Sequence, residues 1–470
     1  MLAWLTTPLI VYFLVSNAVF LTLLVASFIA IRKMIFARPM IESIWKRTAD
    51  FGPPISLIAP SYNEEKTIIA SVRSFLGLDY PKHEVIIVND GSTDQTLERL
   101  KHEFKLLPAS IYFDDRLSKT KIRETYRSQL YQNLIVVDKV NGGKADSINV
   151  GIGYSSTDIF CAVDADCILD RDALLKVVLP FVEDPETTLA AGGTIRPVNG
   201  SAVKGAKVLK PMLPANPVVL FQIVEYLRAF LFGRVGWNLF NSTMIISGAF
   251  GIFNREAVVQ VGGYKEGSVG EDMELVVRLR KWAGDHDRQV SISFIPDPIC
   301  WTEVPGDLLT LGRQRDRWQR GLADSLLTHR KMFFNPRYGL AGLLAYPSFF
   351  FFELIQPIVE LLAYIIIFTG WVTNQIPGEM IYLFFIVDIL FGMLMSFGAV
   401  LIEESAFHKY PKIHQLFILL GVSLFENLGF RQYVMFWRIV GCVRYFFGAR
   451  EWGKMQREGF DIHQVSKKIK

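Results

Sequence analysis

Residues 1–31 contain no charged side chain, and this run constrains the fold more than any other feature of the sequence. Residues 8–31 are long enough to cross a hydrocarbon layer of about 30 Å as a helix. They lack a basic leader and a small-residue cleavage site, which favours a retained helix over a cleaved signal peptide. Basic residues follow the run and none precedes it, so the positive-inside rule predicts an outside N-terminus and a cytoplasmic continuation. These residues are Arg32, Lys33, Arg38, Lys46 and Arg47.

Further apolar blocks lie in the C-terminal third, at residues 341–371 and 381–402. In residues 413–447 the apolar pattern is interrupted by Glu426, Asn427 and Arg431. We therefore predict a broken or re-entrant hairpin there, although a single further span fits the sequence nearly as well. The basic residues beyond it predict a cytosolic tail.

Composition excludes several classes of protein. Hydrophobic residues make up 51% of the chain and charged residues only 20%, which rules out a disordered, collagen-like or disulfide-stapled chain. The four cysteines show no CxxC or Cys/His pairing, so we expect no zinc site and, in the cytosol, reduced thiols. The net charge is +4, and the globular part carries no basic stripe, so we expect no nucleic-acid partner.

Between the apolar ends, residues 51–330 alternate short β-branched runs with helical stretches, which is typical of an α/β domain. Ligands of such sheets bind at the carboxyl ends of the strands. Each predicted strand is followed by more polar residues than a turn needs. The predicted strands are 55–59, 84–88, 134–137, 159–163, 189–191 and 292–295.

Asp164 and Asp166 directly follow the apolar strand 159–163. Two carboxylates one residue apart can reach one divalent cation, and hard oxygen ligands favour Mg²⁺ or Mn²⁺. A bare Asp-x-Asp is more often an acidic surface turn. The buried strand before it and the polar loops beside it favour a metal site, with Asp166 expected to be exposed.

Asp90 and Lys144 also follow predicted strands. Asp90 is suited to accept hydrogen bonds from a nucleobase or ribose, although an Asx-turn is also typical of Asp-Gly-Ser. Lys144 follows two glycines and opens a predicted helix, 144–154, which would place its ammonium and the helix amides near a diphosphate. By itself Gly-Gly-Lys usually marks a turn.

Glu271 and Asp272 begin a stretch with helical period. One of them is a candidate general base that removes a proton from an incoming hydroxyl. Alternatively, both carboxylates merely stabilise the first helical turn through its dipole. The sequence favours neither interpretation.

Gln314, Arg317 and Trp318 stand three and four residues apart on a predicted amphipathic helix, 308–330, and so share a face. An arginine there can bind a phosphate with two hydrogen bonds, and a Trp ring can stack on a sugar. A membrane-surface helix with snorkelling arginines would explain the other arginines equally well. These are Arg313, Arg315 and Arg320.

Between residues 60 and 318 the motifs PSYNEE, VNDGSTD, NGGKADSIN, DAD, SGAFG, VGED and QRDRW occur in this order. Together they resemble the membrane-embedded family 2 glycosyltransferases of the cellulose, chitin, hyaluronan and poly-N-acetylglucosamine synthase group. DxD alone is weak, whereas DxD with GED and QxxRW at these spacings is specific. The resemblance covers nearly all of the chain, which departs from several relatives in having one N-terminal span and no PilZ-like domain.

The resemblance implies a role for each matching residue. The nucleotide would be held by Pro60, Tyr62, Glu64, Asp90, Lys144 and Asp164. The metal, Mg²⁺ or Mn²⁺, would be bound by Asp166 together with Asp164. Asp272 would be the catalytic base, beside Glu271. The diphosphate and the acceptor would be bound by Ser247, Gly248, Thr302, Glu303, Gln314, Arg317 and Trp318.

The fold implied by the resemblance is an α/β GT-A domain, with a Rossmann-like mixed sheet, inserted between transmembrane helices. We expect an N-terminal span with a basic juxtamembrane segment at 1–50 and a cytosolic GT-A domain at 51–307. An amphipathic interface helix would occupy 308–338, transmembrane or re-entrant helices 339–447, and a basic cytosolic tail 448–470.

The implied activity is inverting transfer of glucose or N-acetylglucosamine from a UDP-sugar to a growing polysaccharide, with export between the membrane helices. The alternative is transfer of one sugar to a lipid-linked acceptor. A transporter or scaffold that only binds a nucleotide is less favoured, because binding alone needs no base. The expected location is the cytoplasmic (inner) membrane, with the catalytic domain in the cytosol. The expected partners are the UDP-sugar donor, the glycan acceptor, the lipid bilayer and accessory export proteins.

Glu353, Gln356 and Glu360 form one polar stripe at helical spacing, and Asp388 lies in the next apolar block. Ionisable groups inside a span cost at least about 2.5–3.5 kcal/mol at mid-membrane and usually face the bundle or a wet cavity. We expect the stripe to line the exit path of a glycan. Alternatively, Glu353 pairs with an arginine of the 308–330 helix.

Overall fold

A computed structural model describes residues 3–204, 207–410 and 412–448 of the chain, which divides into two units. The helical unit takes Met1–Ile35, Ala215–Ser242 and Pro305–Gly453, and the α/β unit takes Phe36–Pro214 and Thr243–Val304. Ala215–Ser242 thus belong to the helical unit, although the expected 51–307 domain includes them. Apart from Gly448, the predicted basic tail lies outside the described residues.

The α/β unit is built on a ten-stranded mixed sheet and a two-stranded ribbon, which confirms the predicted fold class. The strands of the sheet are β1 (Ile55–Ser61), β2 (His83–Asn89), β3 (Leu106–Pro108), β4 (Ile122–Ser128), β5 (Leu134–Lys139), β6 (Ile159–Val163), β7 (Ile168–Leu169), β8 (Thr188–Pro197), β11 (Phe250–Asn254) and β12 (Ser291–Thr302). Their order is β3-β4-β5-β2-β1-β6-β11-β8-β12-β7. The ribbon pairs β9 (Ala202–Lys204) with β10 (Lys207–Lys210). All six strands predicted from apolar runs are present.

The direction of each strand decides which loops meet. β5, β2, β1 and β6 are parallel neighbours, and β8 pairs in parallel with β12. β11 runs antiparallel to both β6 and β8, so these two groups point the same way. The carboxyl ends of β5, β2, β1, β6, β8 and β12 therefore lie at one edge, together with the starts of the reversed strands β11 and β4.

Helices pack their apolar faces against the sheet. The helices of this unit are η1 (Ala49–Phe51), α2 (Ile68–Leu76), α3 (Thr96–Phe104), α4 (Lys144–Tyr154), α5 (Ala173–Val177), α6 (Leu179–Glu183), α9 (Arg255–Gln260) and α10 (Glu271–Asp285). The core packs apolar residues of α4 and α10 against β1, β2, β5 and β6. α4 approaches β1 so closely that a Cβ on Gly151 would come within 2.2 Å of Ile58. The bounds of α4 are those of the helix predicted at 144–154.

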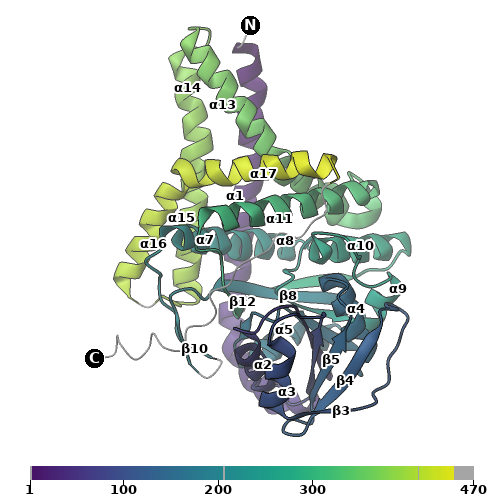
Figure 1. Ribbon diagram of the computed structural model, residues 1–470. Helices are drawn as coiled ribbons and strands as arrows, with labels where there is room; N and C mark the ends of the chain where they lie inside the picture. Colours follow the sequence, from purple (N-terminus) through teal and green to yellow (C-terminus); the bar gives the residue numbers. More distant parts are fainter. Residues whose placement is uncertain (1–2, 205–206, 411, 449–470) are drawn as a thin grey trace. The chain divides into compact units, whose positions relative to one another are not determined.

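The helical unit holds the apolar segments of the chain. Its helices are α1 (Ala3–Thr48, up to Ile35 in this unit), α7 (Pro217–Leu227), η2 (Arg228–Arg234), α8 (Val235–Leu239), α11 (Leu308–Thr328), η3 (Arg330–Met332), η4 (Pro336–Tyr338), η5 (Ala341–Ala345), α12 (Tyr346–Phe349), η6 (Phe350–Leu354), α13 (Gln356–Val372), α14 (Gly378–Phe385), η7 (Ile386–Leu390), α15 (Phe391–Ala406), α16 (Ile413–Phe425), η8 (Glu426–Phe430) and α17 (Arg431–Phe446). Within this unit α1, α13 and α14 run alongside one another, and α17 lies along α11 (Figure 1).

Three helical stretches in the described part of the chain are long and apolar enough to cross a membrane. They are Trp4–Phe36, Gly378–Ala406 and Ile413–Phe446. A fourth arises if Ala341–Leu354 and Gln356–Val372, which bend by 46°, form one span. The expected spans at 8–31 and 381–402 fall inside the first two stretches. Ile413–Phe446 is long enough to cross a membrane, but its backbone leaves helical geometry at Leu428 and at Gly429, whose φ is +101°.

Arginines of α17 hold the carboxylates of the neighbouring helices. Arg431 pairs with Asp388 at 2.8 Å and with Glu360 at 3.1 Å, and both carboxylates are buried. Arg438 pairs with Glu353 at 3.1 Å. Glu353 of η6 and Glu360 of α13 therefore face α17, and the alternative that Glu353 pairs with an arginine of the 308–330 helix is wrong. Whether the stripe also lines a glycan path stays a prediction.

We expect Arg431→Met to destabilise the protein by roughly 3–5 kcal/mol, because it leaves two buried carboxylates without their cation. The measurement is thermal denaturation of the purified protein in detergent. Arg438→Met is the matched control and should cost less, since the side chain of its partner Glu353 is 43% exposed. Equal losses in the two variants would contradict the assignment.

Candidate functional site

The polar loops predicted to carry the chemistry meet at the carboxyl edge of the sheet. Asp164 and Asp166 follow β6, Asp90 follows β2, and Lys144 opens α4 just after β5. Ser247 and Gly248 reach the same edge because they precede β11, whose Phe250 lies opposite Val163 at the end of β6. The reversed direction of β11 thus brings the SGAFG motif to the DAD motif.

Lys144 connects three of these segments. Its ammonium lies 2.7 Å from an Asp164 carboxylate oxygen and 3.3 Å from Glu271, at the start of α10. It also donates a hydrogen bond of 3.2 Å to the carbonyl of Gly248. Burial lowers the pKa of Lys144, but Asp164, Glu271 and Asp272 outweigh this effect and raise the pKa above its ordinary value. Lys144 is therefore a fixed cation at the sheet edge.

Asp272 is held by backbone amides in the same place. One carboxylate oxygen accepts a hydrogen bond of 2.7 Å from the Gly248 N–H, and the other accepts one of 2.8 Å from Met273 N–H. A Cβ on Gly248 would lie 3.1 Å from the Lys144 ammonium and 3.2 Å from Asp272, so a side chain there would crowd both. Ser247 closes this turn by accepting a hydrogen bond from the Ala249 N–H. GED and SGAFG thus form one surface with Lys144.

The two carboxylates of the DAD motif differ in exposure. The Asp164 side chain is 29% exposed, whereas Asp166 is buried, so the expectation that Asp166 is exposed is wrong. The cause is the edge strand β7, which begins two residues later and pairs with β12. In the described residues, no group of three or more His, Cys, Asp or Glu side chains is arranged to hold a metal by itself. Mg²⁺ usually binds one or two carboxylates plus substrate phosphates and water, so two carboxylates at a strand end fit it.

The Asp90 carboxylate is hydrogen-bonded to the segment that leads into α4. Its carboxylate accepts hydrogen bonds from the amides of Gly142 at 2.8 Å and Gly143 at 2.9 Å, and from the side chains of Lys139 and Asn141. An ionised carboxylate offers about four lone-pair positions, and these four donors occupy them. These four hydrogen bonds belong neither to the predicted contact with a nucleobase or ribose nor to the alternative, an Asx-turn. Its contact with a nucleotide stays a prediction.

The loops after β1 and β2 are linked by side-chain hydrogen bonds. Asn63 accepts from the Thr93 N–H at 2.8 Å, and the Glu64 N–H donates to the Thr96 hydroxyl at 2.9 Å. Tyr62 beside them is 49% exposed, and Pro60 is half-buried on β1. Pro60, Tyr62 and Glu64 therefore lie on one connected rim, with the Tyr62 ring accessible.

Thr302 and Glu303 end β12 at the same edge. The Thr302 carbonyl accepts a hydrogen bond of 2.9 Å from the Val198 N–H. Val304, the next residue after Glu303, exchanges hydrogen bonds with the side chain of Asn199. Both residues are thus held beside the end of β8, as members of the same set of strand-end loops.

The QRDRW residues lie on α11 in the helical unit. Gln314 is buried and Arg317 is half-buried, whereas Trp318 is 42% exposed. The Arg315 guanidinium lies 4.1 Å from the Trp318 ring centre and 2.6 Å from Glu225. The role of Gln314, Arg317 and Trp318 at the diphosphate and acceptor stays a prediction.

Two of the four arginines of α11 are buried and do not snorkel to a membrane surface. Arg315 and Arg320 are buried, and Arg320 pairs with Asp316 at 3.0 Å. Only Arg313 of the three named for this alternative is exposed. The interpretation of α11 as a membrane-surface helix with snorkelling arginines is therefore wrong for Arg315 and Arg320, because both have carboxylate partners.

Sequence reasoning missed several buried polar residues behind the site. Lys139 is fully buried and bridges Asp90 and Asp146. Asn149 on α4 accepts a hydrogen bond from the Tyr264 N–H at 2.8 Å and donates one to its carbonyl at 2.9 Å. Asp146 and Asn149 are part of the motif NGGKADSIN, so polar residues inside an otherwise apolar helix were the available signal.

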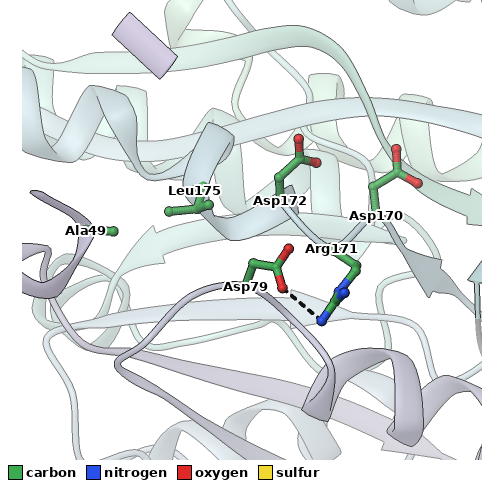
Figure 2. A pocket seen from close by; sticks show the side chains of 6 residues that line it. All are labelled: Ala49, Asp79, Asp170, Arg171, Asp172 and Leu175. Atoms are coloured by element: carbon green, nitrogen blue, oxygen red, sulfur yellow. Dashed lines mark ion pairs between the residues drawn. The ribbon is translucent and has the colours of Figure 1, made fainter. Parts of the chain in front are cut away.

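A cavity of about 520 Å³ lies elsewhere in the α/β unit (Figure 2). Asp79 and Arg171 form an ion pair of 3.0 Å on its wall. β7 runs antiparallel to β12, so the chain after β7 leads away from the carboxyl edge. The cavity holds none of the residues predicted for the site. Its lining residues are Ala49, Asp79, Asp170, Arg171, Asp172 and Leu175.

Comparison with known proteins agrees with this geometry. Residues 56–262 match the model of Glycosyl transferase family 2. A poly-beta-1,6-N-acetyl-D-glucosamine synthase of Staphylococcus aureus (strain COL) is 33% identical over 276 residues, 58% of this chain and 55% of the relative. The synthase of the same name from Staphylococcus epidermidis is 28% identical over 278 residues, with the same coverage. The chain thus spans about half the length of these curated relatives.

The chain also aligns with solved structures. A mannosyltransferase from Pyrobaculum calidifontis in complex with GDP-Man and Mn²⁺ aligns with a TM-score of 0.49 at 18% identity, covering 88% of this chain and 99% of that chain. Staphylococcus aureus TarS 1–349 in complex with UDP-GlcNAc aligns with a TM-score of 0.38 at 16% identity, covering 81% and 92%. The family match at residues 56–262 covers most of the strands of the α/β unit, whose mixed sheet is that of a GT-A domain, and this part of the chain is similar to glycosyl transferase family 2.

Proposed function

We propose that this protein is a membrane-integrated, inverting glycosyltransferase that transfers a sugar from a UDP-sugar to a growing polysaccharide. One observation carries the proposal: the Lys144 ammonium joins Asp164, at the end of β6, to Glu271, beside Asp272 at the start of α10. A cation for a diphosphate, a carboxylate for a metal and a candidate base are thereby within one set of contacts. A protein that only binds a nucleotide would not need the base.

The sugar is expected to be glucose or N-acetylglucosamine. The curated relatives are poly-beta-1,6-N-acetyl-D-glucosamine synthases, which supports a hexosamine donor and a glycan acceptor. The aligned region spans only part of those relatives, so the donor, the acceptor, processivity and any accessory export proteins are part of this proposal.

Inverting transfer at this site moves one proton, forms one bond and breaks another. The acceptor hydroxyl gives its proton to Asp272, and its oxygen forms a bond to the anomeric carbon on the face opposite UDP. The bond between that carbon and the diphosphate breaks, and UDP leaves with the electron pair. The amides of Gly248 and Met273 orient Asp272, each leaving a lone pair on the oxygen that it contacts.

Lys144 stabilises the charge that develops on the departing diphosphate, which is the kind of electrostatic help that usually contributes most to such reactions. Asp164 and Asp166 would hold Mg²⁺ or Mn²⁺, which supplies further positive charge to the diphosphate oxygens when bound. Gln314, Arg317 and Trp318 would bind the diphosphate and the acceptor end. QxxRW and GED on one chain favour a polymerising enzyme over transfer of one sugar to a lipid carrier.

We place the protein in the cytoplasmic (inner) membrane with the catalytic domain in the cytosol. The three candidate spans support a membrane location. Arg32 and Lys33 directly follow the first apolar run, which supports a cytosolic position for the chain beyond it. A nucleotide sugar made in the cytosol would then reach the site directly.

Purified protein in detergent should release UDP from UDP-glucose or UDP-N-acetylglucosamine in the presence of Mn²⁺. Asp272→Asn should lower this release by about 10²–10⁴-fold, since only the proton acceptor is removed. Its affinity for UDP, measured by calorimetry, should stay close to that of the wild type. No UDP release by the wild type from any of a panel of UDP-sugars would refute the proposed function. Lost UDP binding in Asp272→Asn would instead favour the helix-dipole interpretation.

Asp166→Asn should abolish Mn²⁺-dependent UDP release while the protein stays folded, because the amide has nearly the volume of the carboxylate. The measurement is UDP release against Mn²⁺ concentration, with thermal denaturation as the check on folding. Asp172→Asn is the matched control, since Asp172 lies in the separate cavity and pairs with Lys176 at 2.8 Å. Wild-type release by Asp166→Asn would show that this carboxylate does not hold the metal.

Trp318→Ala should shorten the product and weaken glycan binding, with little change in UDP affinity, if the exposed indole stacks on the acceptor. Removing such a stacking surface costs about 1 kcal/mol or more. Trp371→Ala is the control, because Trp371 is also exposed but lies at the end of α13. Unchanged product length in Trp318→Ala would indicate an interfacial anchor.

A further inference from the structure

Behind the loop that carries Lys144, a chain of buried contacts leads away from the sheet edge. Lys139 at the end of β5 is fully buried and pairs with Asp146 at 2.7 Å as well as with Asp90. Asp90 in turn accepts the amides of Gly142 and Gly143. One cation between two carboxylates thus fixes the path of the backbone immediately before Lys144.

Asp146 is itself held from outside α4. One oxygen of its carboxylate accepts hydrogen bonds from the Ser118 hydroxyl at 2.6 Å and the Thr120 hydroxyl at 2.8 Å. Burial raises the pKa of Asp146, but the hydrogen bonds from Lys139, Ser118 and Thr120 outweigh it and hold the pKa below its ordinary value. The Asp146 carboxylate therefore stays ionised opposite Lys139.

Asp146 packs against Gly142, the first of the two glycines before Lys144, and restricts the conformation of its backbone. A Cβ on Gly142 would lie 2.3 Å from the other Asp146 oxygen and 3.2 Å from the Lys139 ammonium. Gly143 follows with φ of +90°, a conformation that favours glycine. A shift of Asp146 would therefore be transmitted to the amides that Asp90 binds and to the first turn of α4.

Residues 114–121 are anchored firmly enough to hold Asp146. They precede β4, whose first residue, Ile122, lies opposite Lys139, so they arrive at the same edge. The Asp114 carboxylate pairs with Arg255 at 2.9 Å, and the backbone N–H of Asp114 donates a hydrogen bond to the Gly153 carbonyl. Leu117 packs against the core. Ser118 and Thr120 are thus presented by a fixed segment.

We propose that Ser118 and Thr120 are positioning residues for the donor nucleotide, acting through Asp146, Lys139 and the Asn141–Gly143 loop. This inference rests on the proposed function, because it assumes that the loop before Lys144 binds the nucleotide. Neither hydroxyl needs to touch the substrate. Their effect is to keep the loop amides and the start of α4 in the orientation that receives a diphosphate.

The test is the double variant Ser118→Ala/Thr120→Val in the full-length protein. It should raise the Kd of UDP and the KM of the UDP-sugar about 10-fold, as the loss of hydrogen bonds to a buried charge predicts. The value of kcat should stay close to that of the wild type. Amide hydrogen exchange in a peptide spanning residues 140–146 should become faster.

Two further variants separate positioning from general stability. Thr120→Ser alone keeps both hydroxyls, so its KM should stay at the wild-type value, unlike that of the double variant. Thr125→Val removes a hydroxyl of β4 itself, which donates to the Ala109 carbonyl, and should change thermal stability without changing KM. An unchanged Kd and KM in the double variant, with wild-type protein still releasing UDP, would overturn this inference alone. A wild-type protein that neither binds UDP nor releases it would overturn the proposed function as well.

Discussion

The charge balance around Lys144 is the interaction on which the candidate site depends. Asp164, Glu271 and Asp272 all influence one ammonium, and like charges this close could not share a site without a cation between them. The ammonium is placed by the first turn of α4, the carboxylates by the end of β6 and the start of α10. Three segments distant in sequence are therefore held together at one ammonium, the charge that the proposed diphosphate ligand would need.

The mixed sheet makes this convergence available. In a purely parallel sheet, the segment before a strand would lie at the far edge. Because β11 and β4 are reversed, the segments before them reach the carboxyl edge, where SGAFG contacts Lys144 and residues 118–120 contact Asp146. The antiparallel strands thus add a contact to the site on one side and a support behind it on the other.

The sequence predicts the elements whose signals are local. Apolar runs identify β1, β2, β5, β6, β8 and β12, and the two glycines before Lys144 identify the start of α4. β4, with the sequence IRETYRS, has no apolar run and was not predicted, because its stability comes from pairing with β5. The partners of Asp90 and the burial of Arg315 depend on residues dozens of positions away, which no periodicity encodes.

Several buried charges of the helical unit, like those of the site, are matched by a partner from a distant segment. This matching divides the QRDRW motif into two parts. Arg315 pairs with Glu225, and Asp316 pairs with Arg320 and with Arg444 of α17, so these residues hold α11 within its unit. Arg315 also stacks on Trp318 and fixes the orientation of an indole that remains 42% exposed. An exposed ring whose orientation is already fixed loses little entropy when it stacks on a planar or sugar face, and this favours the proposed recognition role of Trp318, with Arg315 and Asp316 as its structural support.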